Sequence, residues 1–294
     1  ETLISRIARQ TGRMGLLFPA VALMAVFLVG PIAYSVYGSL TNAALSGYKA
    51  ANPEFVGLEN YVELLTSNAF WKAVLLTVIF VFASAVVGQN ILGLALAMLM
   101  RKAPKILSTL VGGVVVIAWV MPEIVAAFAL YAFFSTDGTL NVLLSYIGLG
   151  GTTWLLTFPM FSVIMANIWR GTAFSMMVYS AALAEVPPEI QEAAKVDGAR
   201  GWQRFFFVTL PMIKGSISTN LLLTTLQTLG VFTLLWVMTG GGPGTQSTTL
   251  PVMAYQEAFK NSLIGYGTAI ATVTIVLGAL FALVYIRALK PEVD

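Results

Sequence analysis

The sequence contains no cysteine and no histidine, and only 10% of its 294 residues are charged. These absences exclude disulfides, thiol nucleophiles, Cys/His zinc sites, imidazole acid–base catalysis and haem ligation by either residue. An ordinary soluble domain carries about 25% charged residues. The chain therefore has too little charge to cover a surface that faces water.

Apolar residues take the place of the missing charge, at 58% of the chain. The 16 lysines and arginines exceed the 13 acidic residues by only three, and this surplus is too small to indicate a nucleic-acid partner. The composition predicts that the lipid bilayer is the main solvent of this protein.

Six nearly uncharged runs recur along the chain, and each is long enough to cross a ~30 Å hydrocarbon core as a helix. They cover 14–40, 73–100, 106–134, 158–184, a stretch from 215 up to the glycine-rich segment 239–246, and 261–286. Pro122 interrupts the third run, where its missing N–H can kink a helix. We predict an all-α integral membrane protein with six transmembrane helices: a cytoplasmic segment 1–13 precedes one transmembrane domain, 14–294.

Basic residues near the ends of the runs predict the orientation. With the amino terminus inside, twelve of the 16 basic residues lie on the inner side, three on the outer side, and Arg170 within a run. Both termini are therefore predicted to be cytoplasmic. The same rule places the charged block 185–214 inside, between the fourth and fifth helices.

This inner block predicts a short helix that begins near residue 188, because Pro187 and Pro188 precede Glu189 as in a first helical turn. Gly198 is placed to end that helix in a left-handed conformation, and a second amphipathic piece would begin at about Ala199. A helix this short is not stable alone in water, so it needs a surface to dock on. The lipid interface and a partner protein both remain open at this point.

The block also contains Glu192-Ala193-Ala194, then Gly198 after three residues, and Val208-Thr209-Leu210-Pro211 after nine more. This pattern resembles the EAA loop of permease subunits in binding-protein-dependent ABC importers, although Val208 stands where isoleucine is more usual. Four further segments resemble the carbohydrate-uptake branch, the maltose and glycerol-phosphate type. They are 57–61 (GLENY), 138–141 (GTLN), Trp169-Arg170 with Phe174, and 239–244 (TGGGPG).

The resemblance implies a type I ABC importer permease fold in a bacterial or archaeal inner membrane, with segment 185–204 as a coupling helix seated on an ATPase. The coupling residues it implies are Glu192, Ala193, Ala194, Asp197, Gly198, Leu210 and Pro211. It implies four partner chains besides the bilayer: a second permease, two ATP-binding subunits and an extracytoplasmic solute-binding protein. The implied cargo is a sugar, an oligosaccharide or a polyol phosphate.

No lysine in the chain is followed by serine or threonine, so the chain has no Walker A phosphate loop. We therefore expect a non-catalytic subunit without a cofactor or metal of its own. ATP and Mg²⁺ are expected to bind to the partner ATPase.

Two charges, Glu123 and Arg170, lie within predicted spans, where a charge costs about 2.5–3.5 kcal/mol at mid-helix. They are opposite in sign, so they can neutralise each other, or Arg170 can face the substrate pathway. Both alternatives remain open.

A polar stripe in the fifth run, Asn220, Thr224 and Gln227, has the spacing of one helical face. Asn167 and Tyr179 in the fourth run are weaker candidates of the same kind. Such residues can join helices or can line a cavity for a sugar. An ion-coupled transporter or channel without an ATPase is the alternative function, but it predicts titratable residues near the midplane, where Glu123 is the one carboxylate that the sequence places.

Overall fold

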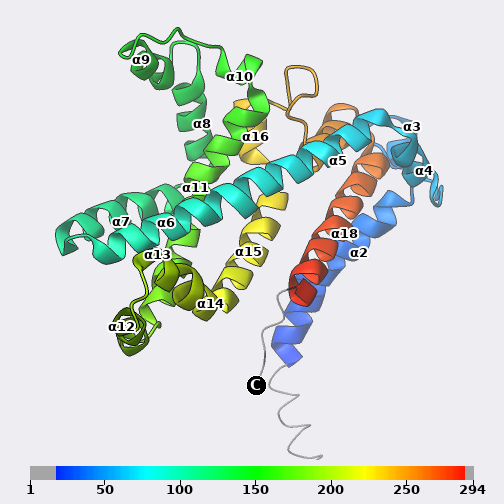
Figure 1. Ribbon diagram of the computed structural model, residues 1–294. Helices are drawn as coiled ribbons and strands as arrows, with labels where there is room; N and C mark the ends of the chain where they lie inside the picture. The colour runs from blue at the N-terminus through cyan, green and yellow to red at the C-terminus, as the bar shows by residue number, and fades with distance from the viewer. Residues whose placement is uncertain (1–17, 289–294) are drawn as a thin grey trace, which may run out of the picture. The chain divides into compact units, whose positions relative to one another are not determined.

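The computed structural model describes residues 18–288, which are helical apart from turns, loops and one isolated bridge between Thr41 and Phe55. The predicted segment 1–13 and the basic residue Lys290 lie outside this range. The described chain forms two compact units (Figure 1). The first comprises 18–66 and 254–273, and the second comprises 67–253 and 274–288.

The helical elements follow one another with short connections. In chain order they are η1 (Ala25–Val29), α2 (Gly30–Ser39), α3 (Tyr48–Ala51), α4 (Glu59–Thr66), α5 (Asn68–Phe80), η2 (Val81–Gln89), α6 (Asn90–Lys102), α7 (Lys105–Val120), α8 (Glu123–Phe134), α9 (Thr139–Ser145), α10 (Trp154–Thr157), α11 (Pro159–Ala184), α12 (Pro188–Val196), α13 (Gly201–Arg204), η3 (Phe205–Thr209), α14 (Leu210–Met212), α15 (Lys214–Leu229), α16 (Thr233–Met238), α17 (Leu250–Tyr255), η4 (Gln256–Lys260) and α18 (Ile264–Ala288). The η elements are π-helical segments that continue neighbouring α-helices.

Among residues 18–288, four helical stretches are long and apolar enough to cross a membrane. They are Phe18–Ser39, Asn68–Lys102, Glu123–Tyr146 and Ile264–Arg287. A fifth is formed if Gly201–Met212 and Lys214–Leu229, which meet at 70°, count as one span. The all-helical membrane architecture is thus confirmed, whereas the count of six stays a prediction.

Helix α11 corresponds to the fourth predicted span, and its 26 residues reach about 39 Å. α11 is not among the four apolar stretches. It is more polar than those stretches because it contains Asn167, Arg170 and several hydroxyl residues. Half of its residues are buried within the chain. α11 is therefore the central helix of the second unit, surrounded by protein along much of its length.

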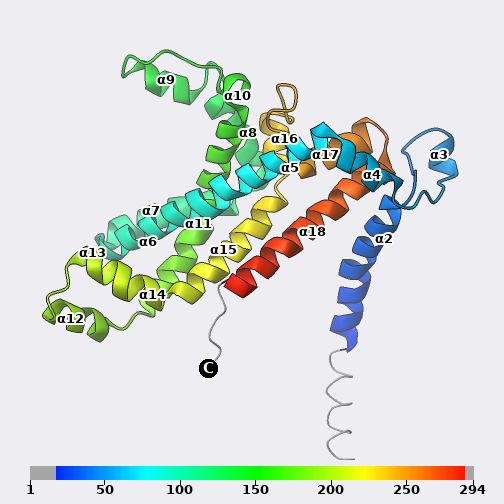
Figure 2. The ribbon, with the colours of Figure 1, turned by 45° about the vertical axis from the view of Figure 1, so that its right-hand side comes forward.

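The long helix α5–η2–α6 packs against α11 at very short range (Figures 1 and 2). A Cβ atom placed on Gly93 of α6 would lie 2.4 Å from Ser175 Cβ and 2.9 Å from the Met176 nitrogen, both on α11. Glycine permits this approach because it has no side chain, as in other close contacts between membrane helices. Gly93 thus permits the close spacing of the two helices, together with Gly88 and Gly171 at the same interface.

The third predicted run does not form one kinked helix, so that expectation is corrected. Met121 and Pro122 are extended, with ψ of 132° and 135°, and they separate α7 from α8. Proline cannot donate to the preceding turn and pushes the residue before it out of the helical region. The fifth run is also divided, because the chain leaves the helix at Gly230 between α15 and α16.

In the first unit, the predicted family segment 57–61 joins α4 to the end of α2. The Asn60 side-chain amide donates to the carbonyls of Ser39 and Thr41, at 2.8 and 2.9 Å, and the Tyr61 hydroxyl lies 2.6 Å from Ser39 Oγ. The two amide bonds satisfy the carbonyl of the last residue of α2 and that of Thr41, just beyond the helix. The segment therefore has a structural role.

Candidate functional site

The predicted coupling segment begins and ends close to where the sequence places it. α12 runs from Pro188 to Val196, and Gly198 has a φ of +82°. The amides of Asp197, Gly198 and Ala199 donate to the last carbonyls of α12, at 2.9, 3.1 and 2.9 Å. A residue with a side chain would be strained at Gly198, so this glycine is what closes the helix and lets the chain turn to α13.

α12 lies at one end of the second unit and none of its residues is buried (Figures 1 and 2). Glu192 and Ala193 are exposed, as is Val196 with 87% of its surface free. Glu192 forms no ion pair or side-chain hydrogen bond with any other residue of 18–288. An exposed apolar and acidic face on so short a helix is suited to a partner surface.

Both ends of this segment are fixed in a buried apolar cluster. Val186, before α12, and Ile213, after α14, are each 3% exposed and pack with Leu183 and Ala97. In addition, the Gln191 amide donates to Thr209 Oγ1 at 2.9 Å. The segment is therefore exposed at its tip, and its base packs against residues of α6 and α11.

Leu210 and Pro211 form α14, just before the chain bends by 70° into α15. Ile213, at the bend, has φ −98° and ψ 11°, and its buried side chain fixes that point in the core. The segment 201–212 thus runs across the direction of α15. Of the predicted coupling residues, Leu210 and Pro211 thus lie directly before this bend, whereas the others lie on α12 or in the turn after it.

The two charges within the predicted spans form an ion pair. Arg170 Nη1 of α11 lies 3.8 Å from Glu123 Oε2, at the first residue of α8. The other carboxylate oxygen of Glu123 accepts from the Leu234 amide at 3.2 Å, at the start of α16. One carboxylate therefore contacts α8, α11 and α16 next to the two helix interruptions, which separate α7 from α8 and α15 from α16. It also neutralises the charge of Arg170, which would be costly in lipid.

Asn220, Thr224 and Tyr179 lie in a buried hydrogen-bond network between α6, α11 and α15. The Asn220 amide donates to Asn90 Oδ1 at 2.8 Å and to Ser175 Oγ at 2.9 Å. The Tyr179 hydroxyl donates to the same Asn90 oxygen, and the Asn90 amide reaches Thr224 Oγ1 at 3.4 Å. All five side chains are buried, so their contacts favour the helix-joining alternative.

Asn167 belongs to a second part of the same interface. Its side-chain amide donates to Ser84 Oγ at 2.8 Å and to Thr228 Oγ1 at 3.3 Å, while its backbone carbonyl accepts from the Gln89 side chain at 3.0 Å. Gln227 is different, because its side chain is exposed. The buried polar residues of α15 at this interface are therefore Asn220, Thr224 and Thr228, whereas Gln227 lies at the exposed edge of the predicted stripe.

Sequence reasoning did not single out Asn90, Gln89 or Ser175, although they complete this network. A signal was present, since Gln89-Asn90 is the one amide pair inside an otherwise apolar run. Neighbouring residues in a helix normally point about 100° apart. The π-helical segment η2, which ends at Gln89, changes this angle between successive side chains. The sequence pattern alone did not predict a π-helical segment here.

The network yields the first mutational prediction. Replacing Asn220 by alanine removes two interhelical hydrogen bonds, each worth about 0.6 kcal/mol on average and up to about 1.7 in membrane proteins. We expect a loss of roughly 1–2 kcal/mol, measured as a lower unfolding midpoint of the purified chain in detergent. Gln227→Ala, on the same helix but exposed, is the matched control and should change stability by less than about 0.5 kcal/mol.

The predicted family residue Asn141 organises the loop between α8 and α11. Its carbonyl oxygen accepts from Trp154 Nε1 at 2.8 Å, and its amide donates to the Thr136 and Thr152 carbonyls at 2.8 Å. Next to this loop, a pocket of about 600 Å³ is lined by residues of α8 and the turn after it, of α10, and of α16 with the glycine-rich loop, among them Tyr131, Asp137 and Pro243.

Comparison with known proteins assigns the family. A family model described as "binding-protein-dependent transport system inner membrane component" matches residues 89–294. The chain is 31% identical over 292 residues to the trehalose/maltose transport system permease protein MalF of Thermococcus litoralis, covering 98% of this chain and 97% of that one. It is 33% identical over 285 residues to the sulfoquinovosyl glycerol transport system permease protein SmoG of Agrobacterium fabrum, covering 94% and 90%. The chain belongs to this family of inner-membrane transport components.

Solved structures agree on the fold. A chain of a bacterial ABC transporter involved in the import of alginate superposes with a TM-score of 0.81 at 24% identity, and the match covers 100% of both chains. A chain of an amino acid ABC transporter gives a TM-score of 0.54 at 14% identity, over 79% of this chain and 98% of that one. The permease fold that the EAA loop implied is thus confirmed, and the chain is a membrane transport subunit rather than an enzyme.

Proposed function

We propose that the chain forms half of the translocation pathway of an importer for a sugar, an oligosaccharide or a polyol phosphate, and that a separate ATPase drives it through segment 185–204. The main support for this proposal is the contrast between the exposed helix of that segment and the buried residues that flank it. Its helix α12 is exposed, while Val186 and Ile213 at its base are each 3% exposed. A rigid base with a free tip is the arrangement that a docked motor needs to move helices in the membrane.

The proposed topology has six spans with both termini in the cytoplasm. α11 and the bent helix that includes α15 would provide the fourth and fifth spans, and α7 with α8 the third. Basic residues end α6 and α18 on the proposed inner side, at Arg101, Lys102 and Arg287. This asymmetry supports the orientation, because positive charge near short loops stays cytoplasmic.

The proposed assembly contains a second permease, two ATP-binding subunits that hold ATP and Mg²⁺, and an extracytoplasmic solute-binding protein. The pocket of about 600 Å³ beside the glycine-rich loop lies on the proposed outer side. Its aromatic, hydroxyl and carboxylate side chains suit either a sugar or the binding protein that delivers one. The names of the relatives, which concern trehalose, maltose and sulfoquinovosyl glycerol, support the carbohydrate class.

The substrate pathway is proposed to pass the two helix interruptions, after which α8 and α16 begin. Discontinuous helices commonly form transport sites near the bilayer midplane. Of the six predicted pathway residues, Arg170 lies at these breaks and Gln227 is exposed. The ion-coupled alternative gains no support, because Glu123 is engaged by Arg170 and by the Leu234 amide.

Substitution of Glu192 tests the proposal. We expect Glu192→Ala in the co-expressed transporter to weaken capture of the ATPase subunits about tenfold and to lower ATP-dependent uptake accordingly. This factor corresponds to about 1.4 kcal/mol, the size of one hydrogen bond to a charged group. Affinity purification of a tagged permease followed by quantitative mass spectrometry measures capture, and uptake is measured in proteoliposomes.

Glu63→Ala is the matched control, since Glu63 is also an exposed glutamate but lies on α4, outside segment 185–204. It should leave capture and uptake unchanged. If no ATP-binding chain co-purifies with the unmodified permease, and uptake persists without ATP, the proposal is wrong.

A further inference from the structure

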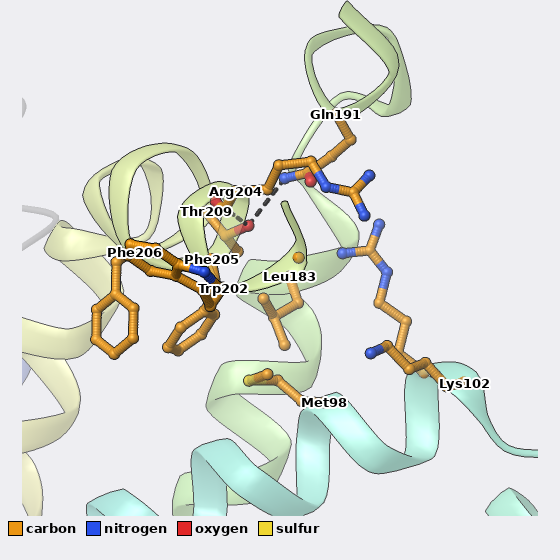
Figure 3. Close-up of a pocket in the computed structure, with 11 residues that line it drawn as sticks. Met98, Lys102, Leu183, Gln191, Trp202, Arg204, Phe205, Phe206 and Thr209 are labelled. Atoms are coloured by element: carbon orange, nitrogen blue, oxygen red, sulfur yellow. Dashed lines mark hydrogen bonds between the residues drawn. The ribbon is translucent and has the colours of Figure 1, made fainter. Parts of the chain in front are cut away.

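A pocket of about 560 Å³ lies between the end of α6 and the segment 201–209 (Figure 3). Its polar end is basic: Arg101 and Lys102 come from α6, and Arg204 comes from α13. The pocket lining includes no aspartate or glutamate. In Figure 3 the charged ends of Lys102 and Arg204 lie on one side of the pocket, away from the rings of Trp202, Phe205 and Phe206.

The three cations of this pocket are not neutralised by the chain. None of them has an ion pair or a side-chain hydrogen bond to any other residue between 18 and 288, and Arg204 Nε is buried without a partner. An unpaired polar atom in a buried position is costly. Three positive charges around one hollow, with no carboxylate beside them, are complementary to an anionic group such as a phosphate.

The apolar side of the pocket faces outward along segment 201–212. Trp202, Phe206 and Phe207 are 57%, 54% and 71% exposed. The segment meets α15 at 70°, so it lies nearly along the membrane surface if α15 crosses the bilayer. Large exposed aromatic residues next to cations, here Arg204 of this segment with Arg101 and Lys102 of α6, are typical of the headgroup boundary.

A second hollow of about 260 Å³ adjoins the first, because Arg101 and Leu183 line both. Its remaining lining is small or apolar except for two serines, and it includes Ala97, Met100 and Ala184. The pair of hollows therefore offers cations for a headgroup next to an apolar surface for hydrocarbon.

We infer that this pocket binds the phosphate headgroup of an anionic phospholipid from the cytoplasmic leaflet, with its acyl chains against the exposed aromatic residues. The inference rests on the proposed orientation, in which the ends of α6 and α11 are cytoplasmic. Gln191 of α12 and Thr209 line the same pocket and bond to each other at 2.9 Å. A bound lipid would thus brace the base of the coupling segment.

Lipid titration of the full chain, alone and without nucleotide, tests this inference. Native mass spectrometry gives apparent dissociation constants for phosphatidylglycerol, phosphatidylcholine and inorganic phosphate. We expect phosphatidylglycerol to bind most tightly, and Lys102→Gln and Arg204→Gln each to weaken it about fivefold, as expected for one cation near an anionic headgroup. Lys105→Gln is the matched control, because Lys105 is an exposed cation of the same turn that does not line the pocket.

The possible results separate a lipid headgroup from a free anion and from a protein partner. Equal binding of both lipids, or equal effects of all three variants, overturns the inference. Phosphate that binds as tightly as phosphatidylglycerol identifies a soluble anion instead. If added ATPase displaces the lipid, the pocket belongs to the protein partner, and the inference also fails. Because Glu192→Ala should leave lipid binding unchanged, a failed coupling test and a failed lipid test can be told apart.

Discussion

Replacing Gly93 by valine is expected to prevent the second unit from packing as it does, and to cause the largest loss of folded protein among single substitutions in α6. The new Cβ would lie 2.4 Å from Ser175 Cβ and 2.9 Å from the Met176 nitrogen. One of these atoms belongs to the backbone of α11, which cannot move aside as a flexible side chain can. Overpacking costs typically 1–3 kcal/mol and sometimes more, and we expect about 3 kcal/mol here.

The control is the same substitution at Gly113 of α7, where a Cβ would meet nothing within 4 Å. Gly113→Val should leave the unfolding midpoint and the yield of monodisperse protein nearly unchanged, because valine loses little in an apolar helix that faces open space. Thermal unfolding in detergent compares the two variants with the unmodified chain. Equal stability of Gly93→Val and Gly113→Val would show that α6 and α11 are not held at the spacing described.

The bounds of helix α12 could be predicted closely from the sequence because their signals are local. Pro188 marks the start of α12 as predicted, and Gly198 has the left-handed conformation that its position indicated. Proline and glycine act on their own backbone, so their effect does not depend on distant residues. The ion pair of Glu123 and Arg170 was among the open alternatives because opposite charges in lipid have few other ways to be stabilised.

The remaining features depend on tertiary contacts, which explains why the pattern did not reveal them. Gln227 has the helical spacing of the polar stripe, yet the interface lies toward Thr228, which bonds to Asn167. The direction of the interface follows from how α11 and α15 pack together, which the local sequence pattern does not contain. Likewise, the basic pocket joins Lys102 to Arg204 across about a hundred positions of sequence, so no local motif contains it.

Removing Glu123 is expected to have the second large effect. Glu123→Ala leaves Arg170 without its partner and the Leu234 amide without its acceptor, at the point where α8, α11 and α16 meet. Breaking a buried ion pair costs about 3–5 kcal/mol. Since the two side chains keep 25% and 29% of their surface exposed, we expect the lower end of that range, about 3 kcal/mol.

A double-mutant cycle separates the pair from its surroundings. If the ion pair is the main stabilising contact, the double variant with both Glu123→Ala and Arg170→Ala loses clearly less stability than the sum of the two single losses. The reason is that the second change removes the charge that the first change left unpaired. Glu63→Ala, at an exposed glutamate, is the control and should be neutral. Additive single effects would contradict the pairing.

Transport by Arg170→Ala then distinguishes a structural role from a role in the pathway. Loss of the assembled importer, restored in the double variant, indicates that Arg170 serves to neutralise Glu123 and to hold α8 and α16 at their breaks. Normal assembly with a changed substrate affinity in proteoliposomes indicates instead that the guanidinium, one quarter exposed beside those breaks, contacts the cargo. The two readouts are independent, since assembly is measured without substrate and affinity is measured only on assembled protein.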